Sequence, residues 1–445
     1  MPEIASPSAS TLTPAKTARQ RTDTFTSTWM MIAVAMAIAT LVAKSRMPQP
    51  LWTMIHLVTL GVLSNGIFQW SWFFARSLAR LSADDPRARR HNTIRVLIFN
   101  AFFASLFVSM WLGWMVGTVI AATGIAAVAA WHGAEMLSVL RERLASRFVV
   151  VVRYYVCSAS FFVLAALLAS FVSATMFSPS IPDALVAMRD RLTLAHALSG
   201  VAGWVGLTIG GTAITLGPTI LRTRMSPDAV SWGVRVLLPW CLSLLLAIAG
   251  ALLGVMPLVG AGILAVGTCA IVGIVYPYAK VLRNKGPREY SAWSFLLGLL
   301  WISVGVCALG VASLFVSTPS QLRALTLMWL PIIGIAGFAQ LFQGALSYLM
   351  PVVIGGGPSV VRIGIAIIDW QYSLRLGLRN SALILELFLF FTSDSPSVHV
   401  LRMAGWLLVI ATFVIDVVIY AKTGITQAQA RRARSETLSE SRQVQ

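Results

Sequence analysis

Residues 195–225 read AHALSGVAGWVGLTIGGTAITLGPTILRTRM, and no Asp, Glu, Lys or Arg occurs in them before Arg222. A helix of about 20 consecutive apolar residues spans the hydrocarbon core of a bilayer, and a helix satisfies all of its backbone hydrogen bonds there. The stretch therefore predicts a transmembrane helix. Its basic end, LRTRM, is typical of the cytoplasmic boundary of a span.

The composition of the whole chain agrees with this prediction. Of 445 residues, 57% are hydrophobic and 11% are charged, and the mean hydropathy is +0.80. Soluble domains carry about 25% charged residues. We therefore expect a multi-pass protein of the cell membrane, whose partner is the lipid bilayer. The net charge of +18 is explained by basic cytoplasmic loops, so no nucleic-acid partner is expected.

Twelve apolar stretches are candidates for spans, which predicts an all-α bundle of about 12 transmembrane helices. They are residues 29–44, 51–75, 95–112, 114–137, 148–174, 192–217, 233–254, 258–280, 291–316, 325–351, 377–392 and 399–421.

The basic residues give the orientation of this bundle. Of the 34 Lys and Arg residues, 28 lie in the tails and alternate loops, including the very basic loop 76–95, and six lie on the opposite side. Positive loops face the cytoplasm, so both termini are predicted to be cytoplasmic. The predicted organisation is a disordered tail at 1–28, a twelve-helix domain at 29–421 and a second disordered tail at 422–445.

The sixth predicted helix carries the strongest functional signal. His196, Ser199, Gly203, Gly206 and Gly210 follow each other at intervals of three and four residues, which places them on one face of an α-helix. A glycine face admits either another backbone or a planar cofactor. An imidazole at the head of that face favours a ligand to haem or to a metal.

Three histidines are predicted to lie at a similar depth near the outer surface. His56 lies a few residues inside the second helix, His196 a few residues inside the sixth, and His399 opens the twelfth. Each of these helices runs inward in the predicted topology. Three imidazoles at one depth are able to meet at one cofactor. The alternative for each of them is a hydrogen bond to a neighbouring helix.

Further polar residues are predicted within the bilayer. Asn65 and Gln69 lie on the second helix, Gln340 and Gln343 share a face of the tenth, and Glu386 lies on the eleventh. A carboxylate in mid-helix costs about 2.5–3.5 kcal/mol on insertion scales. Glu386 therefore needs a partner or a proton, and it either relays protons, binds a cation or forms a structural hydrogen bond.

Three stretches together resemble a known family. They are HLVTLGVLSNGIFQWSWFFARSL (56–78), LAHALSGVAGWVGLTIGGTAITLGPTILRTRM (194–225) and QLFQGALSYLMPVVIGGGP (340–358). They are similar to actinobacterial copper-oxidase-like multi-pass membrane proteins, and distantly to NnrS-type proteins and to subunit I of haem-copper oxidases. The resemblance implies that His56 is an axial haem ligand and that His196 belongs to the copper side. It also implies a redox partner such as a multicopper protein.

The chain departs from this family in ways that limit the chemistry. It has five histidines in total, no adjacent His-His pair and no H-x-x-x-Y, and Phe73 stands where relatives often carry a histidine. An oxidase-type haem-copper centre is therefore excluded. What remains is one haem b, between His56 and either His196 or His399, or one copper with few ligands. Whether the protein is an enzyme stays open.

Two other functions fit the same sequence. A transporter of a small molecule or a metal would use Gln340, Gln343 and Glu386, near the broken tenth helix. A non-catalytic assembly or scaffold subunit would have lost its metal site. Walker A, G-x-S-x-G, H-E-x-x-H and G-x-G-x-x-G motifs are missing from the sequence, and the four cysteines form no C-x-x-C pair.

Overall fold

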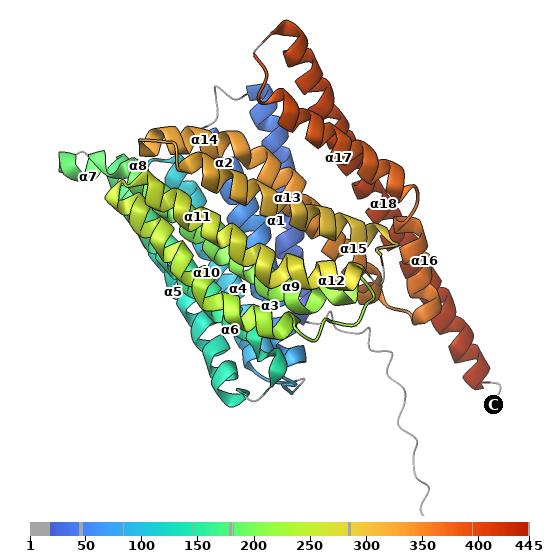
Figure 1. Ribbon diagram of the computed structural model, residues 1–445. Coiled ribbons are helices and arrows are strands. Elements are labelled where there is room, and N and C mark those ends of the chain that lie inside the picture. Colours follow the sequence, from blue (N-terminus) through green and yellow to red (C-terminus); the bar gives the residue numbers. More distant parts are fainter. Residues whose placement is uncertain are drawn as a thin grey trace, which may run out of the picture. The chain divides into compact units, whose positions relative to one another are not determined.

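The computed structural model describes residues 18–43, 48–82, 84–144, 146–177, 180, 182–283, 286–393 and 395–443. All regular secondary structure in these ranges is helical, which confirms the predicted all-α membrane bundle (Figure 1). The chain divides into two compact units, unit 1 (Met1–Ile209) and unit 2 (Gly210–Gln445). The boundary lies within the continuous helix Arg189–Ile220.

Unit 1 is a set of packed helices in which α5 and α6 form the most extensive pair. Its core is aromatic, with Phe68, Phe99, Phe103 and Trp204 all buried. The helices are α1 (Ala18–Ala43), α2 (Pro50–His56), η2 (Leu57–Ser64), α3 (Asn65–Leu78), η3 (Arg87–His91), α4 (Asn92–Trp111), α5 (Met115–Glu142), η4 (Arg147–Val149), α6 (Val150–Phe177), α7 (Asp183–Ala187), α8 (Arg189–Ala197) and η5 (Leu198–Gly206).

Unit 2 begins within α9 and ends with one very long helix. Helices α10, α11, α13 and α15 pack in sequence, and α17 lies against α18 (Figure 1). The helices are α9 (Leu207–Ile220), α10 (Ala229–Leu253), α11 (Met256–Ala270), η6 (Ile271–Val275), α12 (Tyr276–Leu282), α13 (Tyr290–Ser313), α14 (Pro319–Pro331), η7 (Ile332–Ala339), α15 (Gln340–Ile354), α16 (Pro358–Ile368), α17 (Tyr372–Leu389) and α18 (Pro396–Gln443).

The observed helices fall on the predicted spans, and ten helices within the described ranges are long and apolar enough to cross a membrane. The chain is therefore a helical, multi-pass membrane protein. Two predicted spans do not meet this measure. The apolar part of α1 is short, Thr28–Thr40. Helix α17 begins at Tyr372, five residues before the predicted start, and so includes Arg375 as well as Arg379.

The prediction of a disordered tail at 422–445 was wrong for residues 422–443, because α18 continues as a helix to Gln443. The extension packs beside the turn Gly355–Gly357, which has positive φ at all three glycines. Gln427 donates to the carbonyl of Pro351 at 2.7 Å, and Arg431 donates to that of Ile354 at 2.8 Å. The second bond satisfies a carbonyl that the end of α15 leaves free, whereas the carbonyl of Pro351 also accepts from the backbone N–H of Gly355 at 3.1 Å. The first 17 residues of the other predicted tail lie outside the described residues, and α1 begins at Ala18.

The predicted glycine face of the sixth helix does not form. Residues Leu198–Gly206 are π-helical, so the interval of three or four residues no longer keeps side chains on one face. The glycines meet different neighbours. A Cβ at Gly203 would clash with the Cβ of Phe161 at 2.5 Å, whereas a Cβ at Gly200 would reach ordinary contact with Ala165 at 3.8 Å.

Candidate functional site

His56 and His196 lie close together in unit 1, with their rings nearly parallel. Their ring centroids are 6.0 Å apart, and their planes are inclined by 14°. One ring comes from the last residue of α2 and the other from the end of α8, 140 residues later. The structure therefore brings together two of the three histidines that the sequence singled out.

Each imidazole is held by a hydrogen bond from its Nδ1 atom to a backbone carbonyl. Nδ1 of His56 bonds to the oxygen of Trp52 at 2.8 Å, and Nδ1 of His196 bonds to that of Ala165 at 2.8 Å. A carbonyl oxygen only accepts, so Nδ1 carries the proton in both rings. In a neutral imidazole Nε2 then has a free lone pair. Metal-ligating histidines are oriented in this way by a second hydrogen bond.

A local change of helix geometry follows both histidines. The π-helical segment η2 begins at Leu57, directly after His56, and η5 begins at Leu198, two residues after His196. Short π-helical segments within α-helices occur frequently at functional sites. A π-helical segment rotates the residues that follow it around the helix axis. The residues after each histidine therefore point in other directions than in a regular α-helix. The sequence gives no signal for this feature.

Aromatic packing supports one side of the pair. The indole of Trp52 stacks on His56, with centroids 4.3 Å apart and planes inclined by 20°. Both imidazoles are partly buried. The first ring is thus fixed by its own helix through stacking and through the hydrogen bond to Trp52, which limits the positions that Nε2 can take.

The remaining histidines have other surroundings. His132 is fully buried, lies 3.3 Å from Ser71 Oγ through Nε2, and meets Phe68 edge to face. His91 is bonded to Glu135 at 2.7 Å. His399 is exposed near the start of α18 in unit 2, and its participation in a site with His56 and His196 stays a prediction.

Asn65 and Gln69 tie helices of unit 1 together. Asn65 and Asn100 exchange hydrogen bonds between their amide groups, at 2.7 and 3.3 Å, and the indole of Trp29 also donates to Asn100 at 2.6 Å. Gln69 donates to Thr26 at 3.4 Å. These contacts join α3 to α4 and to α1. They support the structural interpretation of both residues more than a ligand-binding one.

Gln340 and Gln343 enter polar networks in unit 2. Gln340 and Asn380 exchange amide hydrogen bonds at 3.1 and 3.2 Å, and Trp301 donates to Asn380 at 2.8 Å. Gln343 accepts from Arg379 at 3.0 Å and from Tyr290 at 3.2 Å. The face of α15 that carries Gln340 and Gln343 is therefore turned toward α13 and α17.

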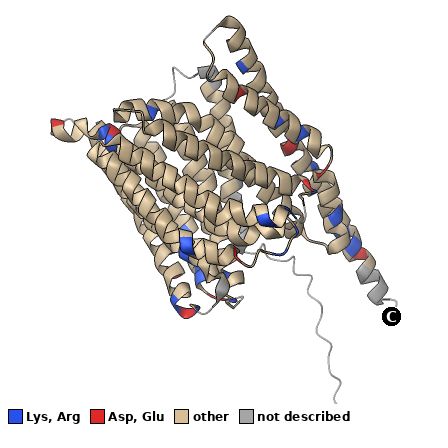
Figure 2. Ribbon diagram, in the orientation of Figure 1, with Lys and Arg blue, Asp and Glu red and all other residues tan. Residues whose placement is uncertain are grey.

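A buried ion cluster that the sequence analysis did not predict lies beside Gln343. Asp416 is fully buried and is paired with Arg375 and Arg379 and with the hydroxyl of Tyr290, which donates at 2.6 Å. Arg379 also donates to Thr412 at 2.9 Å. The sequence signals were Asp416 itself, a carboxylate within the predicted span 399–421 and interpreted as structural, and two arginines four residues apart. Figure 2 shows charged residues along α17 and α18, whereas most other helices carry them near their ends.

Glu386 lies farther along α17 and is also buried, with 3% of its surface exposed. Its nearest charged group is Arg402 of α18, with Nε at 3.8 Å from Oε2, and Oε1 has no hydrogen-bond partner in the described part of the chain. Glu386 therefore has fewer hydrogen-bonding and charged partners than Asp416, although both lie between α17 and α18.

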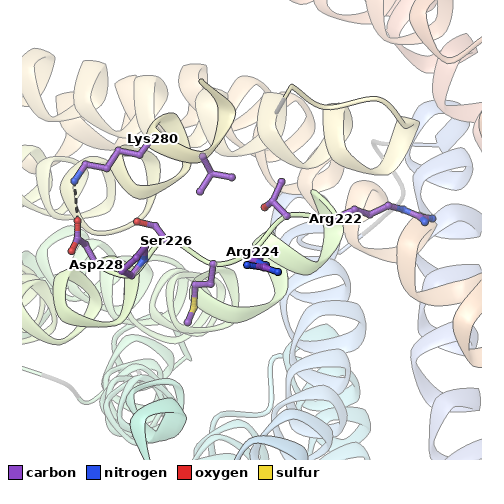
Figure 3. A pocket seen from close by; sticks show the side chains of 9 residues that line it. Arg222, Arg224, Ser226, Asp228 and Lys280 are labelled. Atoms are coloured by element: carbon purple, nitrogen blue, oxygen red, sulfur yellow. Dashed lines mark hydrogen bonds and ion pairs between the residues drawn. The ribbon is translucent and has the colours of Figure 1, made fainter. Parts of the chain in front are cut away.

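A hollow of about 590 Å³ lies elsewhere in unit 2 and contains none of the predicted site residues. Figure 3 shows Arg222, Arg224 and Lys280 around it, with Lys280 bonded to Asp228 at 2.9 Å. Arg222 is paired with Glu289 at 2.8 Å. With two of its three cations already paired, the hollow is a weak candidate for binding an anion.

Comparison of the chain with protein-family models, with curated proteins and with solved structures found no match. The resemblance described above is therefore an expectation that rests on its three sequence stretches. The geometry of the described residues carries the functional argument.

Proposed function

We propose that the protein holds one haem b in the membrane through His56 and His196. The observation that supports this most directly is the close, nearly parallel pair of imidazoles, each with Nδ1 bonded to a carbonyl. Both Nε2 atoms are then free to donate a lone pair.

The number of available ligands favours haem over copper. In the described residues no group of three or more His, Cys, Asp or Glu side chains could hold a metal ion. A haem iron needs only axial ligands from the protein, because the porphyrin supplies the others. A single copper would need additional donors, such as methionine thioethers.

The two rings are also close enough to share one iron, because their centroids are 6.0 Å apart. Gly200, one turn after His196, leaves more room than Gly203 does.

Two axial histidines would direct the protein toward electron transfer. A haem supplies a one-electron redox couple whose potential depends on its axial ligands and on burial. When both axial positions are filled by the protein, substrate binding at the iron is disfavoured. We therefore place the protein in the cell membrane as a redox component of respiration, nitric oxide metabolism or copper handling, with a separate electron partner such as a multicopper protein.

The test is a visible spectrum of the detergent-purified full-length protein, produced with haem and copper available, in its oxidised and dithionite-reduced forms. Iron and copper are quantified in the same sample. We expect a Soret band and near-stoichiometric iron. If copper were found without a Soret band, the bound cofactor would be copper and not haem. A colourless, metal-free protein would refute it.

Variants test the ligands. His56→Ala and His196→Ala are expected to abolish the Soret band while retaining the helical circular-dichroism spectrum. His399→Ala is the matched control, because this exposed imidazole lies in unit 2, and it should retain the band. If His399→Ala abolished the band and His196→Ala did not, the ligand pair would be His56 and His399.

A further inference from the structure

Glu386 occupies a space in unit 2 that a glycine provides. Its carboxyl group, on α17, lies against Gly405 of α18, and a Cβ at position 405 would collide with Oε1. The side chain is 2% exposed. The seam between α17 and α18 is thus shaped to accept a carboxyl group at this point.

The hydrogen bonds around Glu386 do not suit an ionised carboxylate. A carboxylate has about four acceptor positions, and an unpaired buried charge is very costly. Glu386 has one loose ion pair, with Arg402 at 3.8 Å, and its Oε1 has no partner within the described residues. Protonation would remove the charge and leave one hydroxyl donor and fewer acceptors to satisfy.

Asp416 provides an internal comparison within the same seam. Its two oxygens accept from Arg375, Arg379 and Tyr290, so its negative charge is compensated at both atoms. The structure therefore contains one carboxylate with several charged donors and one carboxyl group without them. This contrast indicates different protonation states in one pair of helices.

A hollow on α18 lies next to Glu386. It has a volume of about 570 Å³ and is lined by His399, Arg402, Met403, Trp406, Leu407 and Ile410. Arg402 lines this hollow, is 40% exposed and is also the nearest charged group to Glu386. The guanidinium therefore stands between the hollow and the buried carboxyl group.

We propose that Glu386 is an exchangeable proton-binding site, which is protonated at neutral pH and exchanges its proton through the hollow at His399 and Arg402. On α18, Arg402 is the charged group closest to Glu386, His399 lies one turn before it, and Asp416 lies farther along the helix with its own partners. Helices α13 and η7, which also pack against α17, contain no Asp, Glu, Lys, Arg or His. A metal cation would need several oxygen ligands, whereas the charged neighbour of this carboxyl group is the guanidinium of Arg402.

The site is independent of the proposed haem, because it lies wholly within unit 2 and involves neither His56 nor His196. A protein without haem could still bind this proton, and a haem protein could lack it. An experiment that refutes haem binding therefore leaves the proton-binding proposal open, and the reverse also holds.

Dicyclohexylcarbodiimide is the probe. This apolar reagent takes the acidic proton on one nitrogen while the carboxylate oxygen attacks its central carbon, and the O-acylisourea rearranges to a stable N-acylurea with no leaving group. Full-length protein in lipid nanodiscs would be labelled between pH 6 and 9.5, digested and analysed by mass spectrometry. We expect the adduct at Glu386 at pH 7 and at least a several-fold smaller yield at pH 9.5.

Variants and ions make the result decisive. Glu142→Gln, which removes an exposed carboxyl group of unit 1, should leave the adduct unchanged. Arg402→Gln should extend labelling to higher pH, because it removes the cation that favours the charged form. A denatured sample labelled at pH 5 is the positive control, because it shows that the peptide carrying the Glu386 adduct can be detected. No adduct in the native protein, or protection by NaCl but not by KCl, would overturn the proposal, the latter in favour of a sodium site.

Discussion

The indole Nε1 of Trp204 donates a hydrogen bond to Oγ of Ser64 at 2.9 Å. Both residues are buried. Ser64 is the last residue of the π-helical segment that follows His56, and Trp204 lies in the one that follows His196. This bond therefore joins the two irregular segments on which the imidazole pair depends.

Trp204→Phe is expected to lower the free energy of unfolding by about 1 kcal/mol, the usual net value of one such hydrogen bond. The aromatic ring remains, so the stacking on Phe162, with centroids 4.7 Å apart, is largely kept. Thermal unfolding in detergent measures the change. Ser160→Ala is the control, because this exposed hydroxyl bonds only within its own helix. Equal stability of the two variants would contradict the role given to Trp204.

The tenth predicted span offers a matched pair of glycines. A Cβ at Gly344 would lie 2.8 Å from Cα of Phe295, whereas a Cβ at Gly334 would meet nothing within 4 Å. Gly344→Ala should destabilise the protein by about 1–3 kcal/mol, because α13 and α15 must separate. Gly334→Ala should be neutral or stabilise it by up to about 1 kcal/mol through helix propensity. Thermal unfolding compares them, and similar losses would show that α13 and α15 are not in such close contact.

The bundle itself could be predicted because apolar length alone determines which segments enter the membrane. The exceptions have a physical reason. The span at 377–392 was placed too late in the sequence because Arg375, just before it, reads as a loop charge. Arg375 lies inside α17 together with Arg379, and Asp416 compensates both charges. Hydropathy does not register that compensation.

The imidazole pair was predictable only in part. Similar depth in the membrane indicated that His56 and His196 could meet, and they do. The glycine face was derived from a period of 3.6 residues, and it failed because η5 does not have that period. The carbonyl partners of the two rings, including Ala165 on another helix, are tertiary contacts that no local pattern encodes.

Asp85 gives a prediction on pH dependence outside the membrane spans. Arg87 donates to both of its oxygens, at 3.1 and 2.8 Å, and this hydrogen bonding lowers the pKa of Asp85 below its usual 3.8. A carboxyl group with a lower pKa in the folded state stabilises the fold above the unfolded pKa, and the effect disappears as the pH falls through the folded value.

We expect Asp85→Asn to cost at most about 1 kcal/mol at pH 6, because the pair is near the surface. The difference should shrink as the pH falls below 3.8 and through the lowered pKa of wild-type Asp85. Unfolding midpoints measured from pH 6 down to pH 2.5 provide the comparison. Asp84→Asn, whose carboxyl group is 82% exposed, should follow the wild-type curve. A loss for Asp85→Asn that is constant with pH would contradict the assignment.

Asp416→Asn tests the buried ion cluster of unit 2. The substitution keeps the size of the side chain but leaves Arg375 and Arg379, which are 4% and 0% exposed, without their shared counter-charge. Breaking a buried pair in this way costs about 3–5 kcal/mol, because an uncompensated charge stays in a medium of low dielectric. We expect a large fall in the unfolding temperature. The control is Glu142→Gln, which breaks an exposed pair with Arg87 and should cost less than about 1 kcal/mol.

Replacing Asp416 and both arginines together by apolar residues should recover much of the loss. If Asp416→Asn were as mild as Glu142→Gln, water would have to reach the cluster, and the α17–α18 seam would be a hydrated path rather than a structural clamp.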